Sequence, residues 1–214
     1  MRLLAWLRSW MSAPPAPAPV AMTPIPAAKV EAPVILEPLA PLSSTFQQSS
    51  DYRSGGDKAR KIDLIILHCT EGAWASALRW LTTKDATPVS AHYMIGKDGR
   101  LVQMVAVNDV AYAAGGTKEK PSSWRGRGDV NGRSVNIELE NKNDGRDPYP
   151  PVQIAVCLWL VLRICRGQSV FPDDVVGHYD VDPGRKTDPA GFPMDQFRKS
   201  VDFHLNNQTP GGIA

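Results

Sequence analysis

The 214-residue sequence has little cysteine, little net charge and no long apolar run, and each shortage excludes a class of protein. Its three cysteines are an odd and low number, which argues against a disulfide framework. The formal net charge is only +2, from 24 basic and 22 acidic residues, so no basic footprint for nucleic acid is expected. No stretch reaches the roughly 18–20 apolar residues of a membrane span. The composition that is left is typical of an ordinary globular protein.

The first sixty residues differ in composition from the rest. Residues 1–11, MRLLAWLRSWM, are apolar at helical spacing, but Arg8 interrupts them before the roughly 7–15 apolar residues of a secretory signal are reached. A signal, a membrane anchor and a surface helix stay open, and at most weak membrane contact is expected. Residues 12–41 are rich in Pro and Ala, which is typical of an extended spacer. We therefore assign residues 1–60 to an amphipathic segment with a linker, and residues 61–207 to one folded domain.

Residues 61–207 alternate between strand and helix patterns. Strands are expected at Ile62–Leu67, His92–Ile95, Leu101–Val105, Ser134–Glu140 and Val175–Val176, and helices at Ala73–Thr82, Val152–Cys165 and Met194–Leu205. The Gly-Lys-Asp-Gly between the second and third strands predicts a hairpin. Cys69, Cys157 and Cys165 are expected to be buried, and His204 to be exposed. The alternation predicts an α/β fold with a mixed central β-sheet flanked by helices.

Two of the four histidines come at the ends of predicted strands. His68 ends the first strand, and His178 follows the short strand Val175–Val176. Asp188 comes ten residues after His178, in Lys-Thr-Asp-Pro. Two histidines and one carboxylate are a sufficient protein set for catalytic zinc and leave a fourth position for water. A single histidine after a buried strand is more often structural, but strand ends on one side of a sheet converge.

Glu138 and Lys186 are candidates for amide hydrolysis beside such a metal. Glu138 alternates with Ile137 and Leu139, so it shares one strand face with Glu140. A carboxylate on an otherwise apolar strand needs a partner or a purpose, either a surface salt bridge or proton transfer. Lys186 is either a solvated loop charge or a positive charge for a developing oxyanion.

Five stretches, in order, resemble the N-acetylmuramoyl-L-alanine amidase family. This family includes phage lysozymes with amidase activity, bacterial recycling amidases and the animal peptidoglycan recognition proteins. The stretches lie within residues 62–200 and read IILHCT, VSAHYMIGKDG, NGRSVNIELEN, VVGHYD and DPGRKTDP. The resemblance implies hydrolysis of the amide bond between N-acetylmuramic acid and L-alanine, with peptidoglycan as the partner and one zinc ion, Zn2+, as the cofactor.

The resemblance also implies roles for individual residues. His68, His178 and Asp188 match the zinc ligands of the family. Glu138 matches the acidic residue that acts on the zinc-bound water, and Lys186 matches the lysine that stabilises the transition state.

Three further residues are candidates for contact with the substrate. His92 matches a histidine common in the family and is either a cleft wall or a structural residue. Tyr112 and Trp124 either line the groove or pack inside the domain. Two positions depart from the family: Ala91 stands where some phage members place a catalytic tyrosine, and Tyr112-Ala113-Ala114-Gly115 replaces the Trp-His-Ala-Gly of the recycling type. Substrate preference is therefore not implied by the resemblance.

Three hypotheses for the biological role stay open. A Pro-rich arm before a lone amidase domain favours a phage or prophage endolysin, held in the cytoplasm before its release to the cell wall. The alternatives are a recycling-type amidase acting on soluble muropeptides and a recognition module that binds peptidoglycan without cutting it. A periplasmic or membrane-tethered location is the other expectation, and a monomer is expected.

Overall fold

The structure is a computed structural model that describes residues 35–56, 60–84, 86–115 and 123–207. The amphipathic segment at residues 1–11 and most of the Pro/Ala-rich segment lie outside these ranges. The strands are β1 (Ser44–Phe46), β2 (Leu64–Cys69), β3 (Tyr93–Ile95), β4 (Leu101–Gln103), β5 (Ser134–Leu139) and β6 (Val175–Gly177). The helices are α1 (Trp74–Thr82), α2 (Val130–Arg133), α3 (Pro151–Gln168), the 3-10 turn η1 (Pro172–Asp174), α4 (His178–Val181) and α5 (Met194–Asn206). In this part of the chain, no helix is both long enough and apolar enough to cross a bilayer.

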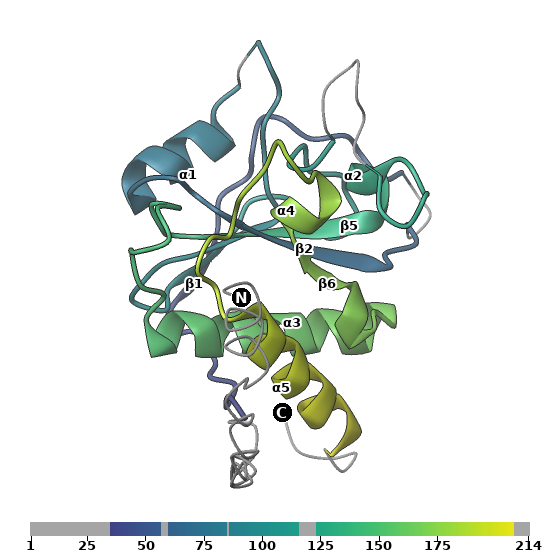
Figure 1. The fold of residues 1–214 in the computed structure, drawn as a ribbon. Helices are drawn as coiled ribbons and strands as arrows, with labels where there is room; N and C mark the ends of the chain where they lie inside the picture. Colours follow the sequence, from purple (N-terminus) through teal and green to yellow (C-terminus); the bar gives the residue numbers. More distant parts are fainter. Residues whose placement is uncertain (1–34, 57–59, 85, 116–122, 208–214) are drawn as a thin grey trace, which may run out of the picture. The chain divides into compact units, whose positions relative to one another are not determined.

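The described strands form one six-stranded mixed sheet in the order β1-β4-β3-β5-β2-β6. Strands β3 and β4 pair antiparallel, as the predicted hairpin requires, whereas β3, β5, β2 and β6 run parallel to one another. Helices α3 and α5 cover one face, and α1, α2 and α4 lie on the other (Figure 1). The predicted α/β fold with a mixed central sheet is confirmed. Because β2, β5 and β6 are parallel, their carboxyl ends meet at the same edge of the sheet.

The main core lies between the sheet and helix α3. Every residue of β2 and β5 is buried, which explains why β2 reads as an almost continuous apolar run. Helix α3 is the expected buried helix, and its Cys157 and Cys165 are buried, as is Cys69 on β2. Buried Gln153 donates from Nε2 to the carbonyl oxygens of Ile95 (3.0 Å) and Glu140 (3.1 Å), so it ties α3 to the ends of β3 and β5.

The folded unit extends N-terminal of the boundary near residue 61 that composition suggests. Strand β1 pairs in parallel with β4, and the backbone N–H of Leu39 donates to the carbonyl oxygen of Ala155 on α3 at 3.0 Å. All three residues of β1 are exposed, so the strand leaves no apolar alternation that a sequence pattern could reveal.

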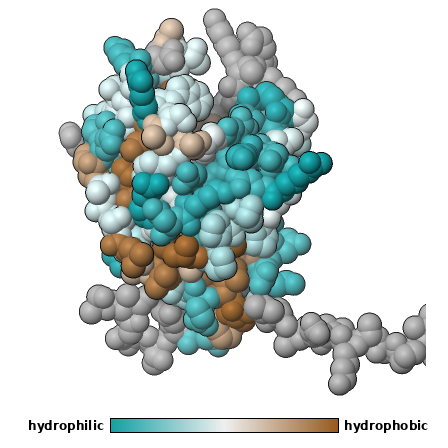
Figure 2. All heavy atoms as spheres, turned by 90° about the vertical axis from the view of Figure 1, so that its left-hand side faces the viewer, coloured by the Kyte–Doolittle hydropathy of each residue, from teal (hydrophilic) through white to brown (hydrophobic). Residues whose placement is uncertain are grey.

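Seen from the left-hand side of Figure 1, apolar surface gathers low on the molecule, below a hydrophilic central region (Figure 2).

The same N-terminal segment corrects the expectation for His204. This residue was expected to be exposed, but it is buried on α5, and its Nε2 lies 2.8 Å from the carbonyl oxygen of Leu36. Leu36 is tied to α5 a second time, because its N–H donates to Ser200 Oγ at 2.9 Å. The expectation was wrong because residues before 61 cover this part of α5.

Candidate active site

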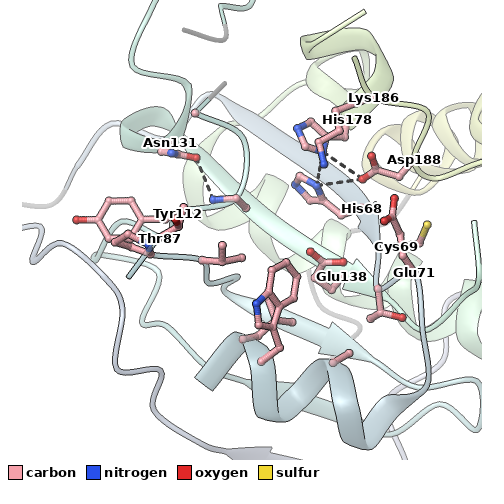
Figure 3. A pocket seen from close by; sticks show the side chains of 18 of the residues that line it. His68, Cys69, Glu71, Thr87, Tyr112, Asn131, Glu138, His178, Lys186 and Asp188 are labelled. Carbon is pink, nitrogen blue, oxygen red and sulfur yellow. Dashed lines mark hydrogen bonds and ion pairs between the residues drawn. The ribbon is translucent and has the colours of Figure 1, made fainter. Parts of the chain in front are cut away.

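Parallel pairing brings the candidate residues to one edge of the sheet. In the register of β2 and β5, His68 lies opposite Glu138. In the register of β2 and β6, Leu67 lies opposite Gly177, and His178 follows as the first residue of α4. Figure 3 shows His68, His178 and Asp188 pointing toward one another, with Glu138 beside them.

His68, His178 and Asp188 form a compact group of ligand atoms. The two Nδ1 atoms are 3.0 Å apart, and Asp188 Oδ2 lies 3.3 Å from Nδ1 of His68 and 3.1 Å from Nδ1 of His178. All three residues are buried. A tetrahedral zinc ion with bonds of about 2.0–2.1 Å needs ligand atoms roughly 3.3–3.4 Å apart. The group therefore fits such an ion in ligand type and, within a few tenths of an ångström, in spacing.

Asn136 holds the ring of His68 in the orientation that metal binding requires. Its Nδ2 donates to Ser134 Oγ at 3.0 Å, so its Oδ1 is the acceptor that lies 3.0 Å from His68 Nε2. In its neutral form, His68 therefore carries its proton on Nε2, which leaves the lone pair of Nδ1 facing His178 and Asp188. Asn136 is not among the residues predicted from the sequence. The signal was a polar residue two positions before Glu138, and hence on the same face of a buried strand.

Hydrogen bonding and burial also set the charge of these groups. Burial raises the pKa of Asp188, but the adjacent rings of His178 and His68 outweigh burial and hold that pKa well below its usual range. Burial lowers the pKa of His68, but the neighbouring Asp188 and Glu138 outweigh it and raise that pKa above its ordinary value. Burial, together with the nearby His68, lowers the pKa of His178 to about 4. An ionised carboxylate and a neutral imidazole are the forms that bind a metal.

Glu138 is a buried carboxyl whose properties suit proton transfer. It is only 9% exposed, which excludes the surface salt bridge considered from the sequence. Burial raises its pKa to about 7, and its Oε2 has no hydrogen-bond partner among the described residues. A group with a pKa near neutrality can both accept and return a proton at physiological pH.

One pocket joins these residues and includes others that were not predicted from the sequence. Of the predicted residues, its lining includes His68, His178, Asp188, Glu138, Lys186 and Tyr112. It also includes residues that no pattern singled out, among them Glu71, Trp80, Asn131 and Arg185. Trp80 is 52% exposed on α1, which is unusual for so large an apolar side chain. Asn131 Oδ1 accepts from the N–H of Ala114 at 2.8 Å and so positions the loop that carries Tyr112.

The structure places neither His92 nor Trp124 in the lining of this pocket. His92 is fully buried: its Nδ1 accepts from the N–H of Asn136 at 3.0 Å, and its Nε2 lies 3.1 Å from the carbonyl oxygen of Asp109. Burial, with the adjacent Arg60, lowers the pKa of His92 to about 3. Trp124 packs against the small cluster that contains Leu64. The burial of His92 and the packing of Trp124 favour the packing alternative for both residues, and their contact with substrate stays a prediction.

Comparison with known proteins gives consistent matches. The family model described as N-acetylmuramoyl-L-alanine amidase matches residues 58–191. N-acetylmuramoyl-L-alanine amidase AmiD of Escherichia coli (strain K12) is 31% identical over 176 residues, which cover 70% of this chain and 60% of AmiD. The 1,6-anhydro-N-acetylmuramyl-L-alanine amidase AmpD of Haemophilus influenzae is 35% identical over 115 residues, which cover 53% of this chain and 59% of AmpD.

A solved structure shows the same architecture. It is the complex of E. coli AmiD with anhydro-N-acetylmuramic acid-L-Ala-D-gamma-Glu-L-Lys, with 29% identity and a TM-score of 0.58. The match covers 74% of this chain and 68% of that one. The chain spans about 60% of the length of the two relatives. The matched residues 58–191 are more than half of the 214 and include all three candidate metal ligands, so the chain belongs to the N-acetylmuramoyl-L-alanine amidase family.

Proposed function

We propose that this protein is a zinc-dependent amidase that hydrolyses the bond between the lactyl group of N-acetylmuramic acid and the L-alanine of the stem peptide. One observation carries the proposal. A buried ligand group of His68, His178 and Asp188 shares a pocket with the buried carboxyl of Glu138, in a chain of the amidase family. A recognition module that only binds would have no need of a complete ligand set.

The residues of the pocket have different roles in the proposed hydrolysis. Zinc, when bound by His68, His178 and Asp188, supplies an activated water and polarises the scissile carbonyl. Glu138 accepts the proton of the attacking water and delivers it to the nitrogen of the departing L-alanine. Lys186, which lines the same pocket, places positive charge near the carbonyl oxygen as negative charge develops there.

For the substrate, we propose a soluble muropeptide that carries an anhydro sugar. The name of the AmpD relative specifies a 1,6-anhydro-N-acetylmuramyl substrate, and the AmiD structure holds an anhydro-N-acetylmuramyl tripeptide. These relatives favour the recycling-type alternative over the endolysin that the Pro-rich arm suggested.

The test is a digestion of two substrates, each with and without a chelator, followed by mass analysis of the products. Purified sacculi report on cell-wall lysis, and soluble anhydromuropeptides report on recycling. We expect release of free L-alanine amino termini from the soluble substrate, lost on chelation and restored by zinc. Faster cleavage of sacculi would restore the endolysin hypothesis. Binding to sacculi with no cleavage of either substrate would contradict the amidase proposal.

The location and assembly of the protein stay predictions. Cytoplasmic storage fits an endolysin, whereas a periplasmic or membrane-tethered site requires residues 1–11 to act as a signal or an anchor. Fractionation of the native cells, with and without deletion of residues 1–11, separates these cases. Light scattering of the purified protein tests the expected monomer.

A further inference from the structure

Asn143 lies in the loop between β5 and α3, and its side chain joins three loops beside the metal-binding group. Its Nδ2 donates to Glu71 Oε1 at 3.1 Å and to Thr187 Oγ1 at 3.1 Å. Its Oδ1 accepts from the backbone N–H of Ala190 at 2.9 Å. One amide side chain thus uses both of its donor hydrogens and its acceptor oxygen in tertiary contacts.

These partners lie next to the metal ligands in the chain. Glu71 is the third residue after His68, in the loop that follows β2. Thr187 comes immediately before Asp188, and Ala190 comes two residues after it. Asn143 therefore holds the chain on both sides of the carboxylate ligand and ties it to the loop of the first histidine.

The loop that carries Asn143 is itself well anchored. Asn143 has a left-handed backbone with φ +58°, a conformation that asparagine tolerates better than most residues. Its N–H donates to Oδ1 of Asn141 at 2.8 Å, and the Nδ2 of buried Asn141 donates to the carbonyl oxygen of Asp147 at 2.8 Å. Because its backbone is held in place, the Asn143 side chain can restrain the loops that it contacts. We call its three side-chain hydrogen bonds, to Glu71, Thr187 and Ala190, the clasp.

We infer that Asn143 is a positioning residue for the metal, because it fixes the loop of Asp188 relative to the loop that follows His68. The Asp188 oxygen must stay about 3 Å from two imidazole nitrogens on other segments, so a small shift of its loop disrupts the ligand group. Groups that orient metal ligands typically change metal affinity by about 10–100-fold when removed. The inference rests on the zinc site proposed above and requires nothing of the substrate.

The first experiment compares Asn143→Gly with the wild type. Glycine adopts a left-handed backbone without strain, so the substitution removes only the side chain. The zinc dissociation constant of metal-stripped, folded protein is measured by competition with a chromogenic chelator. We expect zinc to bind about 10–100-fold more weakly, and the absorption spectrum of the cobalt-substituted protein to change. An unchanged affinity and spectrum would overturn the inference.

Ser169→Gly is the matched control. Ser169 caps the carboxyl end of α3, has φ +57° and does not line the pocket, so the same change is made at the same backbone conformation elsewhere. We expect its zinc affinity to equal that of the wild type. An equal loss of zinc affinity in both glycine variants would mean that the added backbone freedom, and not the loss of the Asn143 hydrogen bonds, lowers zinc affinity.

Thr187→Val gives a second test that does not depend on the folding of the glycine variant. Valine keeps the branched shape and removes the hydroxyl that accepts from Asn143. We expect a loss of zinc affinity smaller than that of Asn143→Gly, and no further loss when the two changes are combined, because they break the same contact. Fully additive effects, or no effect of Thr187→Val, would contradict the clasp.

These measurements separate this inference from the proposed function. A wild-type protein that does not bind zinc would end both. A wild-type protein that binds zinc as tightly as the Asn143→Gly variant would end only the role of Asn143.

Discussion

The two faces of the central sheet are made by the same strands but differ in chemistry. On the face that α3 and α5 cover, β2 places Ile65 and Leu67 in the main core. On the opposite face, the same strand carries Leu64 and Ile66 and then, at its carboxyl end, His68. Successive side chains of a strand point to opposite faces, so one six-residue strand contributes to a hydrophobic core and to a candidate metal-binding group.

Strand β5 shows the contrast more sharply. Val135, Ile137 and Leu139 belong to the main core, whereas the alternate positions include Asn136 and Glu138. On that polar face, Glu138 Oε2, His178 Nε2 and Asp188 Oδ1 are buried without a protein partner in the described part of the chain. Unsatisfied buried polar atoms cost stability, which the apolar face must offset. The comparison implies that substitutions on one face should change activity and those on the other should change stability.

The largest expected effect is the loss of one metal ligand. Asp188→Ala removes one of three protein ligands, and we expect hydrolysis of the muropeptide to fall by at least about 10³-fold, because the metal supplies both the activated water and the polarised carbonyl. The measurements are zinc content by elemental analysis and kcat/KM. A variant that lacks zinc but keeps its activity would contradict the conclusion that activity depends on a metal bound at the polar face.

Glu138→Gln is expected to have a nearly comparable effect on activity alone. The amide keeps the shape of the carboxyl but accepts no proton, so kcat should fall by about 10²–10⁴-fold. Zinc content should stay equal to that of the wild type, since Glu138 is not a ligand. If zinc is lost together with activity, Glu138 acts on the metal and the proposed proton transfer is not needed.

On the apolar face, Leu158→Ala is expected to lower the stability of the fold and to leave the rate of hydrolysis unchanged. Leu158 is fully buried in the core around α3, so its truncation should lower the free energy of unfolding by about 2–5 kcal/mol. Urea unfolding measures this loss, and kcat/KM at a permissive temperature is the control. A loss of zinc affinity in the folded variant would show that the two faces are coupled.

The smallest expected effect is a pH dependence of stability that comes from His92. This residue lies on the polar face but is buried outside the pocket, so its titration should change stability and not activity. Its folded pKa of about 3 lies below its ordinary value of 6.5. The unfolded chain therefore takes up a proton first as pH falls, and stability is lost from about pH 6.5 downward, by at most about 1.4 kcal/mol per pH unit. Urea unfolding of chelator-treated protein at pH 7 and 5.5 measures the slope. His92→Asn should reduce that slope; an equal slope would assign the pH dependence to other groups.

Local pattern accounts for much of the fold. The hairpin of β3 and β4, the buried helix α3 and the shared face of Glu138 and Glu140 were predictable, because each depends on the spacing of residues close in sequence. Glu140 indeed reaches the same side as Glu138: its Oε1 accepts from the N–H of Trp74, the first residue of α1, at 2.9 Å. Strand β1 was not predictable, because an exposed edge strand carries no apolar alternation.

The sequence by itself determined the central strands and the long helices, and which residue types could bind zinc or move a proton. Only the tertiary structure decided which of them meet. His68 and His178 are 110 residues apart in the chain, yet their Nδ1 atoms lie 3.0 Å apart because β2 and β6 pair in one register. The contacts of Asn143 and the exclusion of His92 from the pocket likewise depend on neighbours distant in sequence. Local pattern contains no information about such distances, which follow from strand register and from the packing of loops.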